Sequence, residues 1–436
     1  MSSIRRIDLR AKQLSKSGYQ ALLPRAEMDI DAAIKAIEPI LRSVKNGDER
    51  TLIELCKKYD GVAPKEIRVP QHELKKALKN LDPKIRRALE VSITRIKKVH
   101  KEQSRKDKKT QVVPGGSVAQ RWIPVDRVGL YVPGGNAVYP SSVIMNVIPA
   151  QIAKVPSIAV ASPPQKNNNG LPNSTILATC ELLGISEVYA IGGAQAIATF
   201  AYGVAGICEP VDMVTGPGNI YVAAAKRALR GKIGIDSEAG PTEVAIIADK
   251  YADPVSVAAD LISQAEHDVI AAAVLITDSE KLASQVEVEL AMRIEKTKHS
   301  ARIADAISGK QSAIVLVKNI TQAVDVANAY AAEHLEIQTK NEDAVAKKIR
   351  NAGAIFVGKY SPVSLGDYSA GSNHVLPTGG CACHSSGLSV QSFLKGVNVI
   401  KYNQNAFKAI ANTVITLANS EDLPAHGEAM RRKSDE

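Results

Sequence analysis

The segment Val128-Gly129-Leu130-Tyr131-Val132-Pro133-Gly134-Gly135 sets the pattern on which the fold is built. Its apolar first half predicts a buried strand, and the Pro-Gly-Gly that follows predicts a turn. Residues 141–153 then show helical periodicity. The alternation continues with strands expected at 157–162, 187–191 and 211–215 and helices at 174–183, 194–202 and 219–229. Repeated strand–helix units of this length predict a parallel sheet covered by helices on both faces.

A second series of strands and helices follows the first. Strands are expected at 243–247, 270–276, 313–317 and 354–357, and helices at 254–266 and 322–332. The chain is therefore expected to form two tandem Rossmann-like α/β domains, each incomplete, with a ligand cleft between them.

The domain boundaries follow from these two series. We expect a short N-terminal arm over 1–24, a first α/β domain over 25–130 plus 242–385, a second α/β domain over 131–241, and a helical C-terminal tail over 386–436. The polar stretch 101–116 predicts a linker or an exposed hairpin.

Composition narrows the class of protein. The 436 residues are 45% hydrophobic and 23% charged, which is typical of a globular chain with at least two domains. Aromatic residues make up only 4%, so stacking on nucleic-acid bases has little support. The net charge of +10 comes from basic residues spread along the chain, which favours a basic surface that attracts an anionic cofactor over a nucleic-acid-binding protein.

The cysteines and the apolar runs indicate the compartment. An odd count of five cysteines without a disulfide-like spacing predicts a reduced, intracellular chain. No signal-like segment follows Met1, and no apolar run approaches the roughly 18 residues of a membrane span. We expect a cytoplasmic protein that contacts neither membrane nor nucleic acid.

Two adjacent proton-transfer groups, Glu333 and His334, mark the candidate active site. They stand between an Ala-rich helix and an alternating, strand-like stretch that begins with Leu335 and Ile337. A carboxylate and an imidazole side by side suit general acid–base chemistry. The alternative is a histidine that complements the dipole at a helix C-terminus.

Other histidines stand in contexts that suit metal binding. Gln264 and His267 are three apart on an expected helix and share a face, although spacing alone offers Glu266 and Asp268 equally well. A solvated acidic helix end is the alternative.

Further candidate residues each have an ordinary structural explanation. Asp367 follows Gly366 and could be a turn-former, His374 could be a hydrogen-bonded loop histidine, and His426 could lie in a frayed terminus. Cys381, Cys383 and His384 resemble metal ligands, but Cys-x-Cys spacing is poor for tetrahedral zinc.

Three glycine-rich turns precede expected helices, at 133–136, 191–195 and 215–219. Glycine lets the backbone approach a ligand, and a helix N-terminus offers free N–H groups to phosphate. None of the three matches the full dinucleotide fingerprint, so each alone is equally a turn without a ligand. Three such turns at one edge of a sheet make a turn without a ligand a weaker explanation for the set as a whole.

The ordered motifs of the chain resemble histidinol dehydrogenases over nearly the whole length. The matching segments are Val128–Gly135, Ile191–Ala198, Gly216–Asn219, Ala239–Glu243, Gln264–His267, Glu333–Glu336, Gly366–Tyr368, Gly371–Thr378 and Ala425–Ala429. The resemblance implies an enzyme that uses one zinc ion per subunit and two NAD to oxidise L-histidinol, through L-histidinaldehyde, to L-histidine, the last steps of histidine biosynthesis.

The resemblance also implies roles for individual residues. Zinc would be held by Gln264, His267 and Asp367 of the first domain and by His426 of the tail, and NAD would contact Tyr131, Gln195 and Asn219 in the second domain. Substrate would contact the four zinc ligands and Thr242, His334, His374 and Glu421. His334 would act as base in the first oxidation, and Glu333 would activate water in the second. The tail would cross to the partner of a homodimer, so that His426 and Glu421 serve the other subunit.

Two positions depart from the family pattern. Thr242 stands where serine is common, which preserves the hydroxyl, and Cys381 and Cys383 lie where cysteines are uncommon.

The competing functions are a related dehydrogenase of another primary alcohol such as a sulfonated diol, a zinc hydrolase, and a basic nucleic-acid-binding protein. His374 and Glu421 argue against the sulfonate, because a carboxylate suits a cationic amine. The glycine turns argue against the hydrolase.

Overall fold

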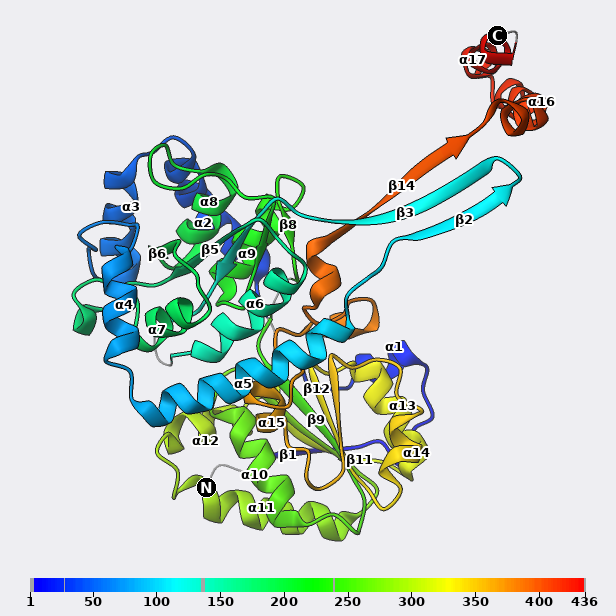
Figure 1. Ribbon diagram of the computed structural model, residues 1–436. Coiled ribbons are helices and arrows are strands. Elements are labelled where there is room, and N and C mark those ends of the chain that lie inside the picture. The colour runs from blue at the N-terminus through cyan, green and yellow to red at the C-terminus, as the bar shows by residue number, and fades with distance from the viewer. Residues whose placement is uncertain (1–3, 27, 135–137, 238–239, 435–436) are drawn as a thin grey trace.

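The computed structural model describes residues 4–26, 28–134, 138–237 and 240–434, arranged as two α/β domains and an extension (Figure 1). Gly135 and Asn136 of the first glycine turn, and Ala239 of a family motif, lie outside the described residues. Both sheets of the α/β domains are parallel throughout, as the strand–helix alternation predicts.

A five-stranded sheet forms the core of one domain, which we call the five-stranded domain (Figure 1). Its strand order is β6 (Val188–Ala190), β5 (Ser157–Ser162), β4 (Arg127–Tyr131), β7 (Met213–Thr215) and β8 (Gly234–Ile235). One face packs on α6 (Pro140–Ile152) and α7 (Ser174–Leu182), and the other on α8 (Gly193–Tyr202) and α9 (Ile220–Leu229). A short 3₁₀ turn, η2 (Lys166–Asn168), interrupts the loop after β5.

The helices of the N-terminal quarter complete the cover of this same sheet. They are α2 (Ile30–Lys45), α3 (Glu49–Leu55), the π-helical turn η1 (Cys56–Asp60), α4 (Gln71–Lys79) and α5 (Pro83–Glu102). Ile37 of α2 packs with α8 and α9, and Ile96 of α5 packs with α6. The structure thus differs from the expected division, which grouped 25–130 with 242–385. The apolar faces of these helices are buried on the five-stranded sheet.

A six-stranded sheet forms the core of the other domain. Its strand order is β1 (Arg5–Asp8), β11 (Ala313–Leu316), β10 (Ala272–Thr277), β9 (Glu243–Ala248), β12 (His334–Gln338) and β13 (Ala354–Val357). The expected N-terminal arm therefore contains an edge strand, because β1 pairs with β11 from Arg5↔Ala313 to Asp8↔Leu316.

Helices cover both faces of the six-stranded sheet. The face that carries Val244 and Ile246 packs on α10 (Pro254–Ala265), α11 (Glu280–Ile294) and α12 (Ser300–Ser308). The opposite face packs on α1 (Lys16–Gln20), α13 (Ile320–Tyr330) and α14 (Glu342–Ala346). The short helix α15 (Val363–Tyr368) joins the α10 side through Val363.

A three-stranded antiparallel sheet projects from the domains and carries the last two helices at its far end (Figure 1). It consists of β14 (Leu394–Tyr402), β3 (Gly116–Pro124) and β2 (Lys108–Val113), followed by α16 (Gln404–Ser420) and α17 (Pro424–Ser434). We call β2, β3, β14, α16 and α17 the extension. The expected hairpin near residue 116 is present, but the tail expected to be helical from residue 386 also contains the short turn η4 (Val390–Phe393) and the strand β14.

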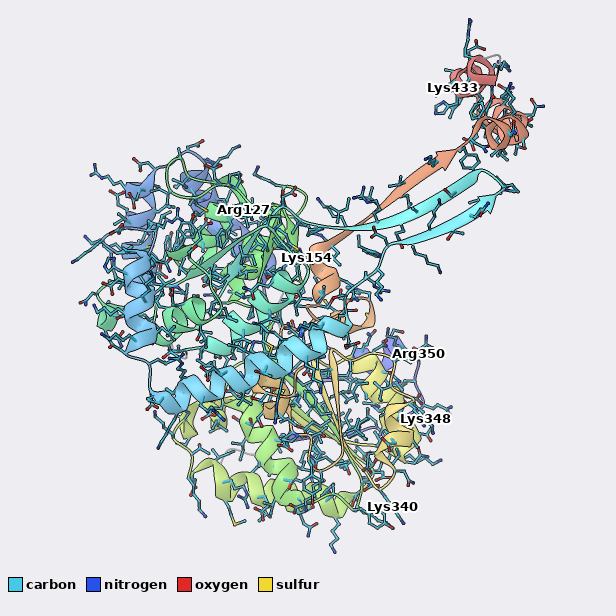
Figure 2. All side chains as sticks on the ribbon, in the orientation of Figure 1. Arg127, Lys154, Lys340, Lys348, Arg350 and Lys433 are labelled. Carbon is cyan, nitrogen blue, oxygen red and sulfur yellow. The ribbon has the colours of Figure 1, made fainter. Side chains whose placement is uncertain are left out.

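Basic side chains are spread over the surface, as the sequence predicts. Figure 2 shows labelled basic side chains on both α/β domains and on the extension, including Lys154, Lys348 and Lys433. Within the described part of the chain, no helix combines the length and the apolar character that crossing a bilayer requires.

Replacing Gly216 with Ala should unfold the five-stranded domain more easily. Gly216 has a φ of +113°, and a Cβ there would lie 2.0 Å from the carbonyl oxygen of Tyr131. Backbone strain and overpacking together should cost about 3 kcal/mol or more. Gly206→Ala is the control, because Gly206 has a φ of +74° but open space around it. Urea unfolding should show the larger loss for Gly216→Ala; equal losses would contradict the close contact.

Candidate active site

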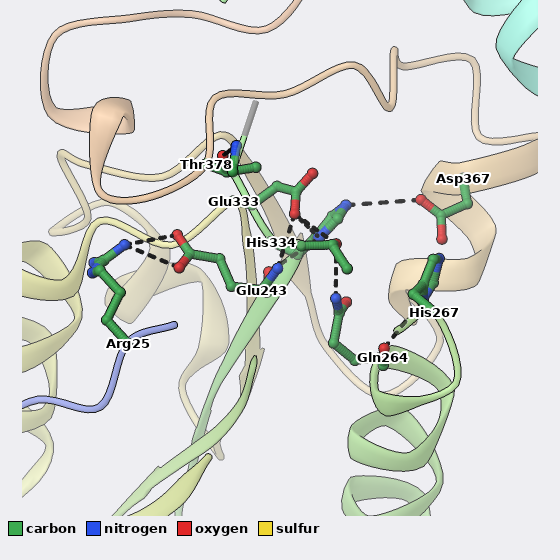
Figure 3. Close-up of polar contacts among 10 residues, drawn as sticks. Arg25, Glu243, Gln264, His267, Glu333, His334, Asp367 and Thr378 are labelled. Carbon is green, nitrogen blue, oxygen red and sulfur yellow. Dashed lines mark hydrogen bonds and ion pairs between the residues drawn. The ribbon is translucent and has the colours of Figure 1, made fainter. Parts of the chain in front are cut away.

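The candidate site lies at the amino ends of two neighbouring strands of the six-stranded sheet (Figure 3). Glu243 is the first residue of β9 and His334 the first residue of β12, and Thr242 and Glu333 immediately precede them. Helices that alternate with parallel strands end at this edge, so the C-terminus of α10 brings Gln264 to the same place. The partial negative charge of helix C-termini favours a cation here.

His334 is held as a neutral base that faces the site. Its Nδ1 donates a hydrogen bond to the backbone carbonyl of Glu243 at 3.2 Å, so Nε2 carries the lone pair. Nε2 is buried without a hydrogen-bond partner and lies 3.7 Å from Oδ1 of Asp367. Burial lowers the pKa of His334, which keeps the ring unprotonated near neutral pH.

Glu333 is fixed by two donors and is easily protonated. Its Oε2 accepts from the Thr242 hydroxyl at 2.7 Å and from the Glu243 N–H at 2.9 Å. Burial raises the pKa of Glu333 to about 7, although both of these hydrogen bonds oppose the rise. A carboxyl with this pKa can exchange a proton at neutral pH.

Gln264 and His267 present free ligand atoms to the same space. The Gln264 amide nitrogen donates to Thr242 Oγ1 at 2.8 Å, which leaves its Oε1 buried and without a partner. His267 lies just after α10, and its Nδ1 contacts the Gln264 carbonyl at 3.2 Å, which leaves Nε2 as the available nitrogen. A backbone carbonyl on the far nitrogen is the usual support for a metal-binding histidine.

These donors fit a zinc ion. An amide oxygen, an imidazole nitrogen and the Asp367 carboxylate converge on one space in Figure 3, and the orphaned Gln264 oxygen needs a positive partner. Among residues 4–26, 28–134, 138–237 and 240–434, no three His, Cys, Asp or Glu side chains gather as a metal-binding cluster. The set on one chain is therefore three donors, one of them an amide. The turn η3 (Cys381–Cys383) contributes none of them.

His374 lies in the same group and links the two domains. Its Nδ1 contacts the Asp367 carbonyl at 3.0 Å, and its Nε2 lies 3.2 Å from the hydroxyl of Ser142 on α6. Burial lowers the pKa of His374 to about 4. The helix that follows the first glycine turn thus reaches the site.

The sequence analysis did not identify the ion pair between Arg25 and Glu243, whose backbone N–H donates to Glu333. Arg25 donates to both carboxylate oxygens of Glu243, at 3.1 and 2.9 Å, and to the carbonyl of Tyr330. Burial raises the pKa of Glu243 to about 7, and Arg25 opposes that rise. Arg25 stands in an irregular segment, and no local pattern marks it as a partner for a residue of β9.

The three expected NAD contacts share one pocket on the five-stranded domain. Tyr131, Gln195 and Asn219 line a space of about 750 Å³ between the turns that precede α8 and α9. The Tyr131 hydroxyl accepts from the Gly193 N–H at 3.1 Å, and Asn219 caps the N-terminus of α9. The positive ends of two helix dipoles at one pocket suit a phosphate-containing ligand.

A buried carboxyl in this pocket was also missed. Asp60 ends the π-helical turn η1, and its Oδ2 accepts from the Gln195 amide at 3.1 Å. Burial raises the pKa of Asp60 to about 6. The π-helical geometry that carries it here has no sequence signature.

The remaining two expected site residues lie far from this site in the same chain. Glu421 is the C-cap residue after α16, and His426 lies on α17 at the far end of the extension (Figure 1). Both are exposed. The chain does not bring them to its own Gln264 and His267.

Comparisons with known proteins agree on one family. The family model for histidinol dehydrogenase matches residues 23–434. A histidinol dehydrogenase of Thermobifida fusca is 61% identical over 429 residues, 98% of this chain and 97% of that protein. One of Mycolicibacterium smegmatis is 58% identical over 432 residues, 98% and 97% of the two chains. The crystal structure of histidinol dehydrogenase from Elizabethkingia anophelis has a TM-score of 0.91 at 31% identity and covers 99% of this chain and 98% of that one.

Replacing Thr242 with Val should destabilise the metal-free protein. The hydroxyl serves both Glu333 and Gln264, so its loss leaves two buried polar groups short of a partner. Each such group typically costs about 1–3 kcal/mol. Thr242→Ser keeps the hydroxyl and is the control. Urea unfolding should separate the two variants; equal stability would show that the hydroxyl does not hold these side chains.

Proposed function

The chain belongs to the histidinol dehydrogenase family, an oxidoreductase family of histidine biosynthesis, and we propose that it oxidises L-histidinol by two NAD-linked steps at a zinc site. The product of the first step would be L-histidinaldehyde and that of the second L-histidine. The observation that carries the proposal is the unpaired Nε2 of neutral His334, set beside Glu333 and three metal donors.

Gln264, His267 and Asp367 would hold the zinc from one subunit, and His426 from the partner of a homodimer. When bound, zinc would fix the imidazole and amine of the substrate as a template. The proposed substrate contacts are these four residues together with Thr242, His334, His374 and Glu421. The buried, unpaired Oε1 of Gln264 supports this arrangement.

In the first oxidation, Nε2 of His334 would accept the hydroxyl proton of histidinol. The hydrogen bond from Nδ1 to the Glu243 carbonyl holds the ring in the tautomer that makes this possible. NAD, bound at the pocket of Tyr131, Gln195 and Asn219, would accept the hydride.

In the second oxidation, water must add to the aldehyde before hydride can leave. Glu333 would take the proton from this water, and its pKa of about 7 suits a base at neutral pH. The Thr242 hydroxyl and the Glu243 N–H keep the carboxylate in place between the two steps.

The purified full-length chain should produce NADH from L-histidinol, and a strong zinc chelator should abolish this activity. Added zinc should restore this activity, because the chain stays folded without the metal and keeps its zinc-binding side chains in place. The measurement is absorbance at the NADH band. Activity that persists after metal analysis shows complete removal would contradict the zinc proposal, and absence of NADH with zinc present would contradict the proposed function.

Glu333→Gln and His334→Ala should fail at different steps. Loss of His334 should slow oxidation of histidinol, and loss of Glu333 should mainly slow oxidation of histidinaldehyde, each by roughly 10²- to 10⁴-fold. The two substrates are assayed separately under single-turnover conditions. Equal losses on both substrates for both variants would contradict the division of roles.

Mixing two inactive variants should restore activity if the extension crosses to a partner. His426→Ala and His267→Ala subunits are combined under conditions that exchange subunits. A crossed heterodimer has one site with both lesions and one with neither, so about half of the activity per heterodimer returns. If each tail serves its own subunit, every site keeps one lesion, and no mixing ratio restores activity.

A further inference from the structure

A row of polar side chains on β12 faces the helix α10. His334, Glu336 and Gln338 alternate along the strand and therefore share one face, while Leu335 and Ile337 point to the α13 side. On α10, Asp260 and Gln264 are four residues apart and also share a face. His334 and Gln264, at one end of the two rows, belong to the proposed site. The other members, Glu336, Gln338 and Asp260, have no assigned role.

The side chains of Glu336, Gln338 and Asp260 contact one another directly. The Gln338 amide nitrogen donates to Asp260 Oδ2 at 2.9 Å and to Glu336 Oε2 at 3.0 Å. The carboxyl groups of Asp260 and Glu336 therefore lie next to each other, on one amide nitrogen. The other oxygen of Glu336 accepts from the backbone N–H of Val363 at 2.8 Å.

Two buried carboxyl groups on one donor cannot both ionise easily, because their like charges repel, so the pair is expected to share one proton. Asp260 on α10 is the titratable group that faces Glu336, while Gln338 on β12 and the Val363 N–H on α15 face it as neutral donors. Burial, followed by the charge of Asp260, raises the pKa of Glu336 to about 8, which agrees with a shared proton at neutral pH.

The contacts join the three elements that carry the proposed site. Asp260 belongs to α10 with Gln264, Glu336 belongs to β12 with His334, and Val363 begins α15, which carries Asp367. We propose that Asp260, Glu336 and Gln338 form a positioning clamp, which sets the relative placement of Gln264, His334 and Asp367. None of the three is a catalytic residue, and the inference rests on the proposed zinc site.

The test is zinc affinity of the full-length protein, measured with zinc alone by competition against a chromogenic chelator. Glu336→Ala removes the link between the three elements, and a lost supporting contact typically lowers metal affinity by roughly 10- to 100-fold. Glu336→Gln can still accept from Val363 and donate to Asp260, so its zinc affinity should stay close to that of the parent. Ile337→Ala is the control for general loss of packing, because Ile337 points to the opposite face.

Three results would overturn the clamp: an unchanged zinc affinity in Glu336→Ala, an equal loss in Glu336→Gln, or an equal loss in Ile337→Ala. His267→Ala separates this failure from failure of the proposed function. If His267→Ala also keeps full zinc affinity, the zinc site itself is wrong and the clamp falls with it. If His267→Ala loses zinc while Glu336→Ala does not, only the clamp is wrong. NADH affinity should be unchanged in all variants, because the pocket lies on the other sheet.

A second measurement applies even if Glu336→Ala does not fold. The folded-state pKa of Glu336, about 8, lies above its ordinary value of 4.5. The stability that its proton provides is therefore complete below about pH 4.5 and is lost as pH rises towards 8. In metal-free Glu336→Gln no shared proton is needed, so its unfolding temperature should fall less between these pH values than that of the parent. Parallel curves would overturn the shared proton.

Discussion

The hydroxyl of Thr242 is the contact on which the geometry of the candidate site depends. It donates to Glu333 and accepts from Gln264, so one small group fixes a carboxylate just before β12 and an amide on α10. Because the Gln264 amide nitrogen is used in this way, the Gln264 oxygen is left without a partner, and the Nδ1 bond of His334 to the Glu243 carbonyl leaves the His334 Nε2 without one as well. Buried polar atoms without partners are costly in a folded protein, and a ligand that satisfies both recovers that cost.

The two α/β domains use opposite edges of their sheets, and the reason is electrostatic. The candidate zinc site lies where α10 and α13 end, so the negative ends of helix dipoles point towards a cation. The candidate NAD pocket lies where α8 and α9 begin, so the positive ends of these helix dipoles favour an anion such as phosphate. Ser142 and His374 connect the two regions through α6. The same strand–helix repeat thus offers a candidate cation site at one edge of one sheet and a candidate anion site at the opposite edge of the other.

Local sequence patterns predicted the helices and strands better than they predicted which strands and side chains pair with each other. The strands of 128–215 and 243–357 follow from alternation, as do the parallel sheets, and the family motifs fit the comparisons. The pairing of β1 with β11 and the strand β14 were missed, because both depend on residues distant in sequence. At the site, Arg25, Glu243 and Asp60 were missed because a buried charge is recognisable only from its partner. Glu336 was read as part of an alternating strand, yet it lies in the middle of the buried sheet at 1% exposure.

The position of β1 has a consequence for how the chain can be assembled during synthesis. All strands of the five-stranded sheet, with the helices that cover it, lie between Ile30 and Ile235. The N-terminal strand, by contrast, pairs with β11 and has no neighbour in its own sheet until residue 316 has been made. The residues of β1 therefore leave the ribosome long before they can form these hydrogen bonds, and the five-stranded domain can fold while they wait.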